Sequence, residues 1–109
     1  MIYTIVSRYP YIFMQIIKQL LEFEWDEGNR GKNFQKHKVS DGECEEVFFD
    51  PNKKIYKDVI HSGKEKRYIL LGATKADRIL FVVFTIRKSR IRIVSARDLN
   101  KKELYLYEN

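Results

Sequence analysis

The sequence predicts an α+β domain in which two helices precede a small antiparallel meander sheet and a short helix follows it. Three apolar runs, at residues 66–72, 79–87 and 90–96, are separated by short polar loops, which favours antiparallel pairing of neighbouring strands. Helix-start residues, Asp26 and Ser40, lie ahead of these runs. This order is typical of the α+β class, and 109 residues are enough for one domain.

The first 21 residues are expected to form an extension outside the fold, so that the domain spans residues 22–109. The apolar run at 11–21 is interrupted by polar residues and is much shorter than the roughly 20 residues that span a bilayer. It also lacks the cleavage site of a signal peptide, and Met14 is a candidate alternative translation start. A single cysteine, Cys44, forms no disulfide within one chain. We therefore expect a cytoplasmic protein with no membrane partner.

The first predicted elements are a short strand and a helix. Residues 21–25 alternate apolar and acidic side chains, which is typical of a strand. Asp26 can then cap a helix that runs to about Lys36, although two glycines weaken it. Phe34 is the main apolar anchor that we expect for this helix. The apolar face of the preceding strand would consist of Leu21, Phe23 and Trp25.

A second helix is predicted to begin at Ser40 or Asp41, because an acidic residue follows two or three positions later, as in a capping box. Pro51 ends it. The next segment is polar, with an expected strand around residues 55–60. The apolar face of the helix would consist of Cys44, Val47 and Phe48, at helical spacing.

The last helix is expected after Arg97, with Asp98 or Asn100 as its cap. Tyr105 and Tyr107 fall within it. We expect these rings to pack on the sheet, the alternative being that they stack on a nucleic-acid base.

Positive charge is concentrated in the second half of the chain. The formal net charge is +6, yet residues 60–97 contain ten Lys and Arg against two acids, a net of +8. The remaining residues therefore carry −2. This asymmetry favours a polyanionic partner for one part of the surface and a different partner for the rest.

Several arginines lie in apolar strands that carry no acid to pair with them. A tight loop at Lys88–Ser89 places Arg87 opposite Arg90 and Thr85 opposite Arg92. Like charges opposite one another destabilise a sheet, and a phosphate lying across the face would relieve the repulsion. The alternatives are solvated positions at a basic hairpin tip, or pairing with carboxylates of a partner protein.

Two further arginines depend on the strand register. If the loop at 72–78 places Ile69 opposite Val83, Arg67 joins the row formed by Thr85 and Arg92; an odd register sends it to the other face. The same hairpin register, continued without interruption, places Arg97 at the rim of the core face.

Other candidate chemistry is sparse. His37 follows Lys36 at the end of the first helix, where it either interacts with the helix C-terminus or acts as a general base or phosphate contact. His61 lies in a polar loop. Two histidines with no third ligand at metal spacing do not make a zinc site, so no metal or other cofactor is expected.

An ordered set of motifs points to one family. The stretches FEWDEGNRGKNFQKHKVS, EEVFFDP, EKRYILLG, LFVVFTIR and IRIVSARDLNKKELYLYE occur in this order. From about Glu22 to the C-terminus the chain resembles the BrnT family, toxins of type II toxin–antitoxin systems with a RelE-like ribonuclease fold. The resemblance implies metal-independent endoribonuclease activity that arrests growth.

The resemblance also implies roles for individual residues. Arg67 and Arg92 would bind the scissile phosphate and stabilise the transition state, and Lys36 or His37 would transfer protons. The side chains implied to hold RNA are Arg87, Lys88, Arg90 and Arg97.

A cognate antitoxin is the implied partner, with a BrnA-like ribbon-helix-helix domain through which alone the complex would contact DNA. Two departures from the family pattern concern the proton-transfer residues. Lys38 replaces a glycine that would end a helix in the left-handed conformation, and Asp41 replaces an aromatic residue that would pack on the core. The alternatives to a ribonuclease are a non-catalytic basic module that binds RNA or protein, and an enzyme acting on small phosphate esters.

Overall fold

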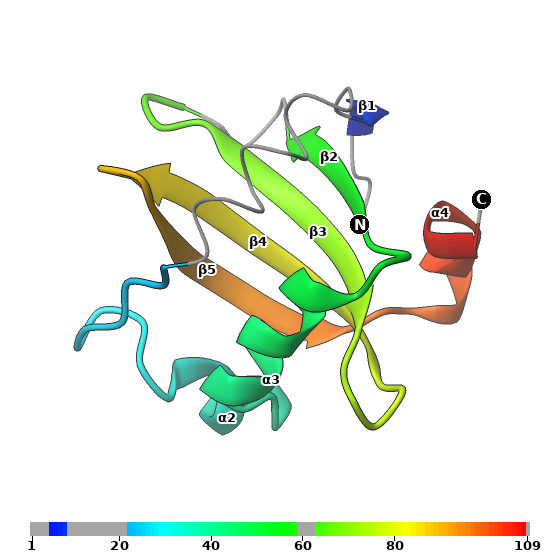
Figure 1. Ribbon diagram of the computed structural model, residues 1–109, viewed down its shortest axis with the longest axis horizontal. Coiled ribbons are helices and arrows are strands. Elements are labelled where there is room, and N and C mark those ends of the chain that lie inside the picture. The colour runs from blue at the N-terminus through cyan, green and yellow to red at the C-terminus, as the bar shows by residue number, and fades with distance from the viewer. Residues whose placement is uncertain (1–4, 9–21, 59–62, 109) are drawn as a thin grey trace.

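The computed structural model describes residues 5–8, 22–58 and 63–108, and its centre is a five-stranded antiparallel sheet (Figure 1). The spatial order of the strands equals their order in the chain, so the sheet is a meander, as predicted. The strands are β1 (Ile5–Arg8), β2 (Lys54–Asp58), β3 (Arg67–Ala73), β4 (Ile79–Arg87) and β5 (Arg90–Asp98).

Helices precede and follow the main strands, also as predicted. The helix predicted to start at Asp26 begins instead at Lys32, because residues 27–31 form turns and Gly31 has a left-handed φ of 70°. No helix within the described residues has the length and apolarity needed to cross a membrane. The helical elements are α2 (Lys32–His37), α3 (Asp41–Glu46), η1 (Val47–Phe49), η2 (Lys101–Glu103) and α4 (Leu104–Glu108).

The acidic–apolar stretch before α2 adds a short parallel segment beside β5. Phe23 bridges Ile91, the amide of Glu24 donates to the Ile91 carbonyl at 2.8 Å, and the Ile91 amide donates to the Glu22 carbonyl at 2.8 Å. Phe23 and Trp25 both pack against the core, which confirms the predicted alternation. Glu22 and Glu24 therefore fall on the opposite face of the sheet.

Two asparagines continue this cover along the outer edge of β5. The Asn29 side-chain amide donates to the carbonyl of Ile93 at 3.1 Å, and Asn33 Oδ1 accepts from the Ala96 amide at 2.9 Å. Both asparagines are buried, whereas Phe34, the expected anchor of α2, is 52% exposed. The prediction for Phe34 is therefore wrong, because α2 is docked through a polar side chain that satisfies the β5 backbone.

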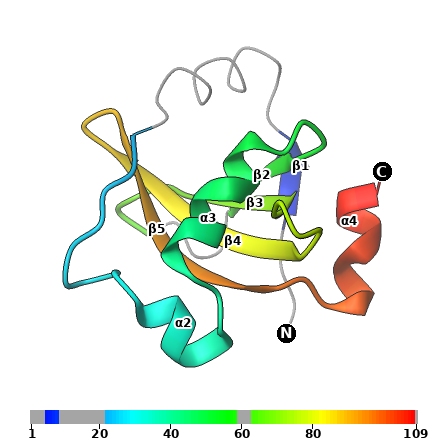
Figure 2. The ribbon, with the colours of Figure 1, turned by 60° about the horizontal axis from the view of Figure 1, so that its bottom comes forward.

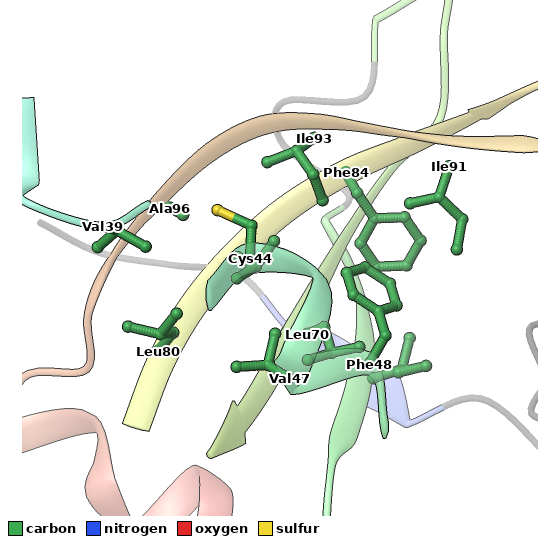
Figure 3. Packing of buried hydrophobic residues seen from close by; sticks show 12 residues of the cluster. Val39, Cys44, Val47, Phe48, Leu70, Leu80, Phe84, Ile91, Ile93 and Ala96 are labelled. Carbon is green, nitrogen blue, oxygen red and sulfur yellow. The ribbon is translucent and has the colours of Figure 1, made fainter. Parts of the chain in front are cut away.

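Helix α3 covers one face of the sheet and supplies the main core (Figure 3). Ser40 and Glu43 form the predicted capping box, and Cys44, Val47 and Phe48 are all buried, as their spacing indicated. Burial raises the pKa of the Cys44 thiol to about 12, so the group stays protonated and is a poor nucleophile. The sheet residues that complete this core include Leu70, Leu80, Val82, Phe84, Ile91 and Ile93.

The opposite face of the sheet has a smaller core near the C-terminal helix α4. Figure 2 shows α4 beyond the end of β5. Leu106 and Tyr107 pack against it, so the expectation for Tyr107 is confirmed, whereas Tyr105 is 60% exposed. The Tyr107 hydroxyl donates to Asp50 at 2.6 Å, and the same carboxylate accepts from the Ala73 amide at 2.8 Å. The sheet residues of this second core are Ile69, Leu71 and Phe81.

Part of the expected N-terminal extension lies in the sheet, because β1 pairs with β2 as an edge strand. The apolar run at 11–21, His61 and the end of the strand expected at 55–60 lie outside the described residues. The division of the chain at residue 21 therefore remains a prediction.

Replacing Asn33 by alanine should leave the buried amide of Ala96 without an acceptor. An unpaired buried donor costs about 1–3 kcal/mol, so we expect the free energy of unfolding of Asn33→Ala to fall by that amount in urea titrations. Gln35→Ala, at an exposed position of the same helix, is the control and should change it little. Equal effects of the two substitutions would contradict this account of the β5 edge.

Candidate functional site

The arginine-rich hairpin has the predicted register at its tip. Arg87 lies opposite Arg90, and Thr85 lies opposite Arg92. The two turn residues, Lys88 and Ser89, have φ angles of 49° and 64°, as the tight turn of a two-residue hairpin requires. The side chains of Arg90 and Arg92 thus lie on one face of β5.

A bulge changes the register further along the hairpin. Beyond Phe84 the pairs are Val83 with Ser95 and Phe81 with Arg97, so one extra residue of β5 has been accommodated. Ala96 consequently turns into the main core, and Arg97 turns to the same face as Phe81. The prediction that Arg97 lies at the rim of the core face is therefore wrong, because period-2 alternation ends at a bulge.

The register of β3 places a further arginine beside this hairpin. Ile69 pairs with Val83, which is the even register, so Arg67 lies on the same face as Thr85. We call this side of the sheet the arginine face and define it by Arg67, Arg87, Arg90 and Arg92.

One row of side chains crosses the arginine face from strand to strand. It runs from Asp58 in β2 through Arg67 and Thr85 to Arg92 in β5, and Glu24 continues it beyond the edge of β5. Thr85 is 1% exposed, and among the described residues its Oγ1 is the buried side-chain polar atom that lacks a hydrogen-bond partner. Such an atom needs an explanation, because buried polar groups are nearly always paired.

Carboxylates of the same chain pair with the arginines of this face. Arg87 donates to both oxygens of Glu65, at 2.6 and 2.9 Å. Arg92 Nη1 donates to Glu24 at 2.9 Å and to Asp26 at 2.8 Å. We expected a phosphate across the face to relieve the repulsion between these guanidinium groups, but segments outside the hairpin bring acids of the same chain to Arg87 and Arg92. A longer pair joins Arg90 to Glu22 at 3.8 Å.

These ion pairs differ in exposure. The side chains of Arg87 and Glu65 are 48% and 40% exposed, and such surface pairs contribute about 0–1 kcal/mol. The Arg92 side chain is only 14% exposed and is fixed by two carboxylates. Hydrogen bonds from Arg92 lower the pKa of Asp26, and those from Arg87 lower the pKa of Glu65.

Two other residues that were expected to hold RNA lie apart from this row. Arg97 donates to both oxygens of the buried Glu103, at 2.8 Å each, and its guanidinium carbon lies 4.1 Å from the centre of the Phe81 ring. It therefore holds η2 against the sheet. Lys88 is exposed at the hairpin tip.

Lys36 and His37 are exposed at the end of α2, and the structure does not bring them to Arg67 and Arg92. Arg78 marks their position, because its Nη2 donates to the His37 carbonyl and to the Asp98 carboxylate, each at 3.1 Å. Asp98 is six residues from Arg92 along β5, roughly 20 Å at the usual rise of a strand.

The two departures from the family pattern both have local solutions. Lys38 adopts the left-handed conformation expected of the glycine it replaces, with φ 57°, and its carbonyl accepts from Arg78 at 2.7 Å. Asp41 accepts from the amide of Gly31 at 3.1 Å instead of packing in the core. Arg78 also pairs with Glu43 and Asp98, a structural role that sequence reasoning missed.

Sequence reasoning also missed Glu24 and Asp26 as members of the site. The alternation of residues 21–25 contained the signal for Glu24, because its side chain had to lie opposite the apolar face of that strand. The pairing of this segment with β5 was the missing information.

The fold and this face define a small α+β protein that presents arginines and carboxylates together, as acid–base chemistry at a phosphodiester requires. Residues 25–103 match the family of BrnT ribonuclease toxins of type II toxin–antitoxin systems. This is more than half of the chain, which therefore belongs to the BrnT family, and membership implies an antitoxin partner. No curated protein matches the chain. Within the described residues, no group of His, Cys, Asp and Glu could hold a metal ion.

The paired carboxylates should make the fold sensitive to acid. The pKa values of Asp26, Glu65 and Asp98 are lowered in the folded chain, each chiefly by hydrogen bonds from an arginine. Their contribution is therefore complete above the ordinary carboxyl pKa of about 4 and is lost as the pH falls through the lowered values. We expect the free energy of unfolding, measured with urea, to fall below about pH 4.

The matched variant for this test is Glu65→Gln, which removes one of the titrating partners. Its loss of stability between neutral and acid pH should be smaller than that of the parent chain. Glu27→Gln, at an exposed position, should behave like the parent. An identical pH dependence in all three proteins would rule out a contribution from the Glu65 pair.

Proposed function

We propose that this chain is a metal-independent endoribonuclease that cleaves RNA, arrests growth and is neutralised by a cognate ribbon-helix-helix antitoxin. The observation that carries the proposal is the row in which Arg67 and Arg92 flank Thr85, whose hydroxyl has no hydrogen-bond partner among the described residues, in a chain of a ribonuclease-toxin family. Contact with DNA would occur only through the antitoxin.

The proposed reaction uses the nucleophile that RNA itself contains. The 2′-oxygen attacks the adjacent phosphorus, the bond from phosphorus to the 5′-oxygen breaks, and the products are a 2′,3′-cyclic phosphate and a free 5′-hydroxyl. A base accepts the 2′-hydroxyl proton, and the leaving oxygen takes up a proton. Cationic donors stabilise the extra negative charge of the pentacoordinate transition state, which is the role proposed for Arg67 and Arg92.

Binding of the phosphate requires an exchange of partners on the arginine face. The two carboxylates around Arg92 keep its guanidinium in place in the free protein. A phosphate that enters beside it offers two oxygens to the guanidinium fork, as a carboxylate does, and its oxygens can accept from the Thr85 hydroxyl. Pairs as exposed as that of Arg87 with Glu65 cost little to exchange, so Arg87 and Arg90 can hold flanking phosphates.

Glu24 is the carboxylate best placed to act as the base. Its Oε1 accepts from Arg92 at 2.9 Å, and its Oε2 has no hydrogen-bond partner among the described residues. Both oxygens of Asp26 are occupied by Arg92, one of them also by the Gly28 amide, and both oxygens of Glu65 are occupied by Arg87.

We assign no chemical step to Lys36 or His37, because each lies at the other end of β5 from Arg92. The ion pairs on the arginine face also support a second candidate function. If they are purely structural, the chain is a module that binds RNA or a protein without cleaving it. Substitutions in the row distinguish the two functions.

The purified protein should cleave single-stranded RNA in the presence of EDTA and leave 2′,3′-cyclic phosphate ends. Arg67→Ala and Arg92→Lys should each reduce the cleavage rate by about 10²–10³, because each removes a donor fork from the transition state. Lys in place of Arg92 keeps a cation beside Glu24 and Asp26, so the fold should survive. Lys102→Ala, at an exposed position, is the control.

The same variants can be tested in cells. Induction of the gene alone should arrest growth, and co-expression with the neighbouring antitoxin gene should restore it. Folded Arg67→Ala and Arg92→Lys variants that cleave RNA and arrest growth as the parent does would refute the proposed site. Absence of cleavage by the parent protein would favour the binding module.

Glu24→Gln should keep the shape of the side chain and its acceptor oxygen but remove the basic carboxylate. We expect the cleavage rate to fall by about 10²–10⁴, and the acidic limb of the pH–rate profile to disappear. Asp26→Asn, which changes the other carboxylate bound to Arg92, should retain that limb. A normal profile in Glu24→Gln would show that another group is the base.

A further inference from the structure

The cations around α2 differ from those of the arginine face because no carboxylate of the described residues pairs with them, although Arg30 donates to the Trp25 carbonyl at 3.2 Å. Between Gly28 and Ser40 the sequence contains no Asp or Glu, and no ion pair of the described residues involves a cation of this segment. We call this region the α2 surface and define it by the exposed side chains of Arg30, Lys32, Phe34, Lys36, His37 and Lys38.

An aromatic ring lies among these cations. Phe34 is 52% exposed because Asn33, its neighbour in α2, occupies the position that faces β5. The ammonium group of Lys38 lies 5.3 Å from the centre of the Phe34 ring. The end of α2 therefore presents to the solvent an exposed ring with the Lys38 ammonium group beside it.

We propose that the α2 surface binds single-stranded RNA, with the backbone on its cations and one base stacked on Phe34. The proposal rests on the proposed function, for which it names a second contact surface. An exposed ring on a basic surface is an arrangement by which proteins hold single strands without reading their sequence. Phosphates that bind here displace only counterions, whereas phosphates on the arginine face must also displace carboxylates.

The position of α2 allows one RNA strand to reach both surfaces. In Figure 1 the segment before α2 starts beside β5, loops outward and brings α2 back to the same edge. Its hydrogen bonds place Glu24 beside Ile91 at one end and Asn33 beside Ala96 at the other. Arg92 lies four residues from Ala96 and six from Asp98 along β5, so the α2 surface and the arginine row are roughly 13–20 Å apart across one edge of the sheet. A strand several nucleotides long spans this distance, so longer substrates should bind more tightly than dinucleotides.

An acidic protein is a less suitable occupant. A stable protein interface buries about 800 Å² on each partner, and α2 offers six residues with one exposed ring. The antitoxin is therefore a less suitable occupant of this surface than RNA, and the variants below distinguish the two.

The test uses the full chain and a fluorescent 2′-O-methyl RNA, which lacks the nucleophile and cannot be cleaved. Fluorescence anisotropy over a range of salt concentrations gives the affinity and its salt dependence. Phe34→Ala should weaken binding by roughly 5- to 100-fold, as expected for the loss of one stacked base, with an unchanged slope. Lys32→Ala combined with Lys36→Ala should lower the slope by about 0.7 for each lysine.

Matched controls lie elsewhere on the surface. Phe49→Ala removes another exposed ring, and Lys101→Ala with Lys102→Ala removes two other exposed lysines. Unchanged binding in the α2 variants, or equal losses in the controls, would overturn the proposal. So would α2 variants that bind this RNA normally but fail to bind the antitoxin. Cleavage of an unmodified dinucleotide by the parent chain tests the proposed function separately.

Discussion

The outer edge of β5 determines where the segment that precedes the main strands is placed. An edge strand presents unpaired amides and carbonyls, and these must be satisfied. Here the backbone of residues 22–24 pairs at Ile91, and the side chains of Asn29 and Asn33 take over at Ile93 and Ala96. The segment that precedes the meander is thereby aligned with its last strand. The positions of α2, of the acidic residues and of the exposed ring all follow from this alignment.

The same alignment determines the electrostatics of the arginine face. In the sequence, the basic strands and the acidic residues 22–26 belong to different halves of the chain. Pairing beside β5 brings Glu24 and Asp26 to Arg92, while Glu65, just before β3, reaches Arg87. The face is therefore an ordered array of both signs rather than an unpaired basic surface. An array of this kind holds donors in place and supplies acceptors for a proton, which a row of arginines alone does not.

Local sequence patterns were enough to predict much of the fold, whereas the site depends on long-range pairing that these patterns do not reveal. Alternation predicted the strands, and the capping box at Ser40 predicted α3. The loop at Lys88–Ser89 predicted the hairpin register as far as Ile93. The bulge that turns Arg97 to the other face of the sheet has no signature in a single sequence. Val94 and Ser95 are both exposed, so either residue could lie opposite Val83. The prediction for Phe34 failed because hydrophobicity predicts burial only on average. The amide of Ala96 needed an acceptor, so an asparagine occupies the buried position of α2.

The arginines of the arginine face and the lysines of the α2 surface would therefore bind RNA in different ways. A guanidinium already held by carboxylates has little conformational entropy left to lose, but a phosphate must compete for it, which suits a site of chemistry. Unpaired lysines on a short helix bind phosphate by releasing counterions, which gives affinity without precise geometry. Residues 22–38 supply both the carboxylates that bind Arg92 and the lysines of α2, so a single segment joins the arginine face to the α2 surface. An RNA strand attracted to α2 by charge would then be held roughly 13–20 Å from Arg92, along the edge of β5 that this segment covers.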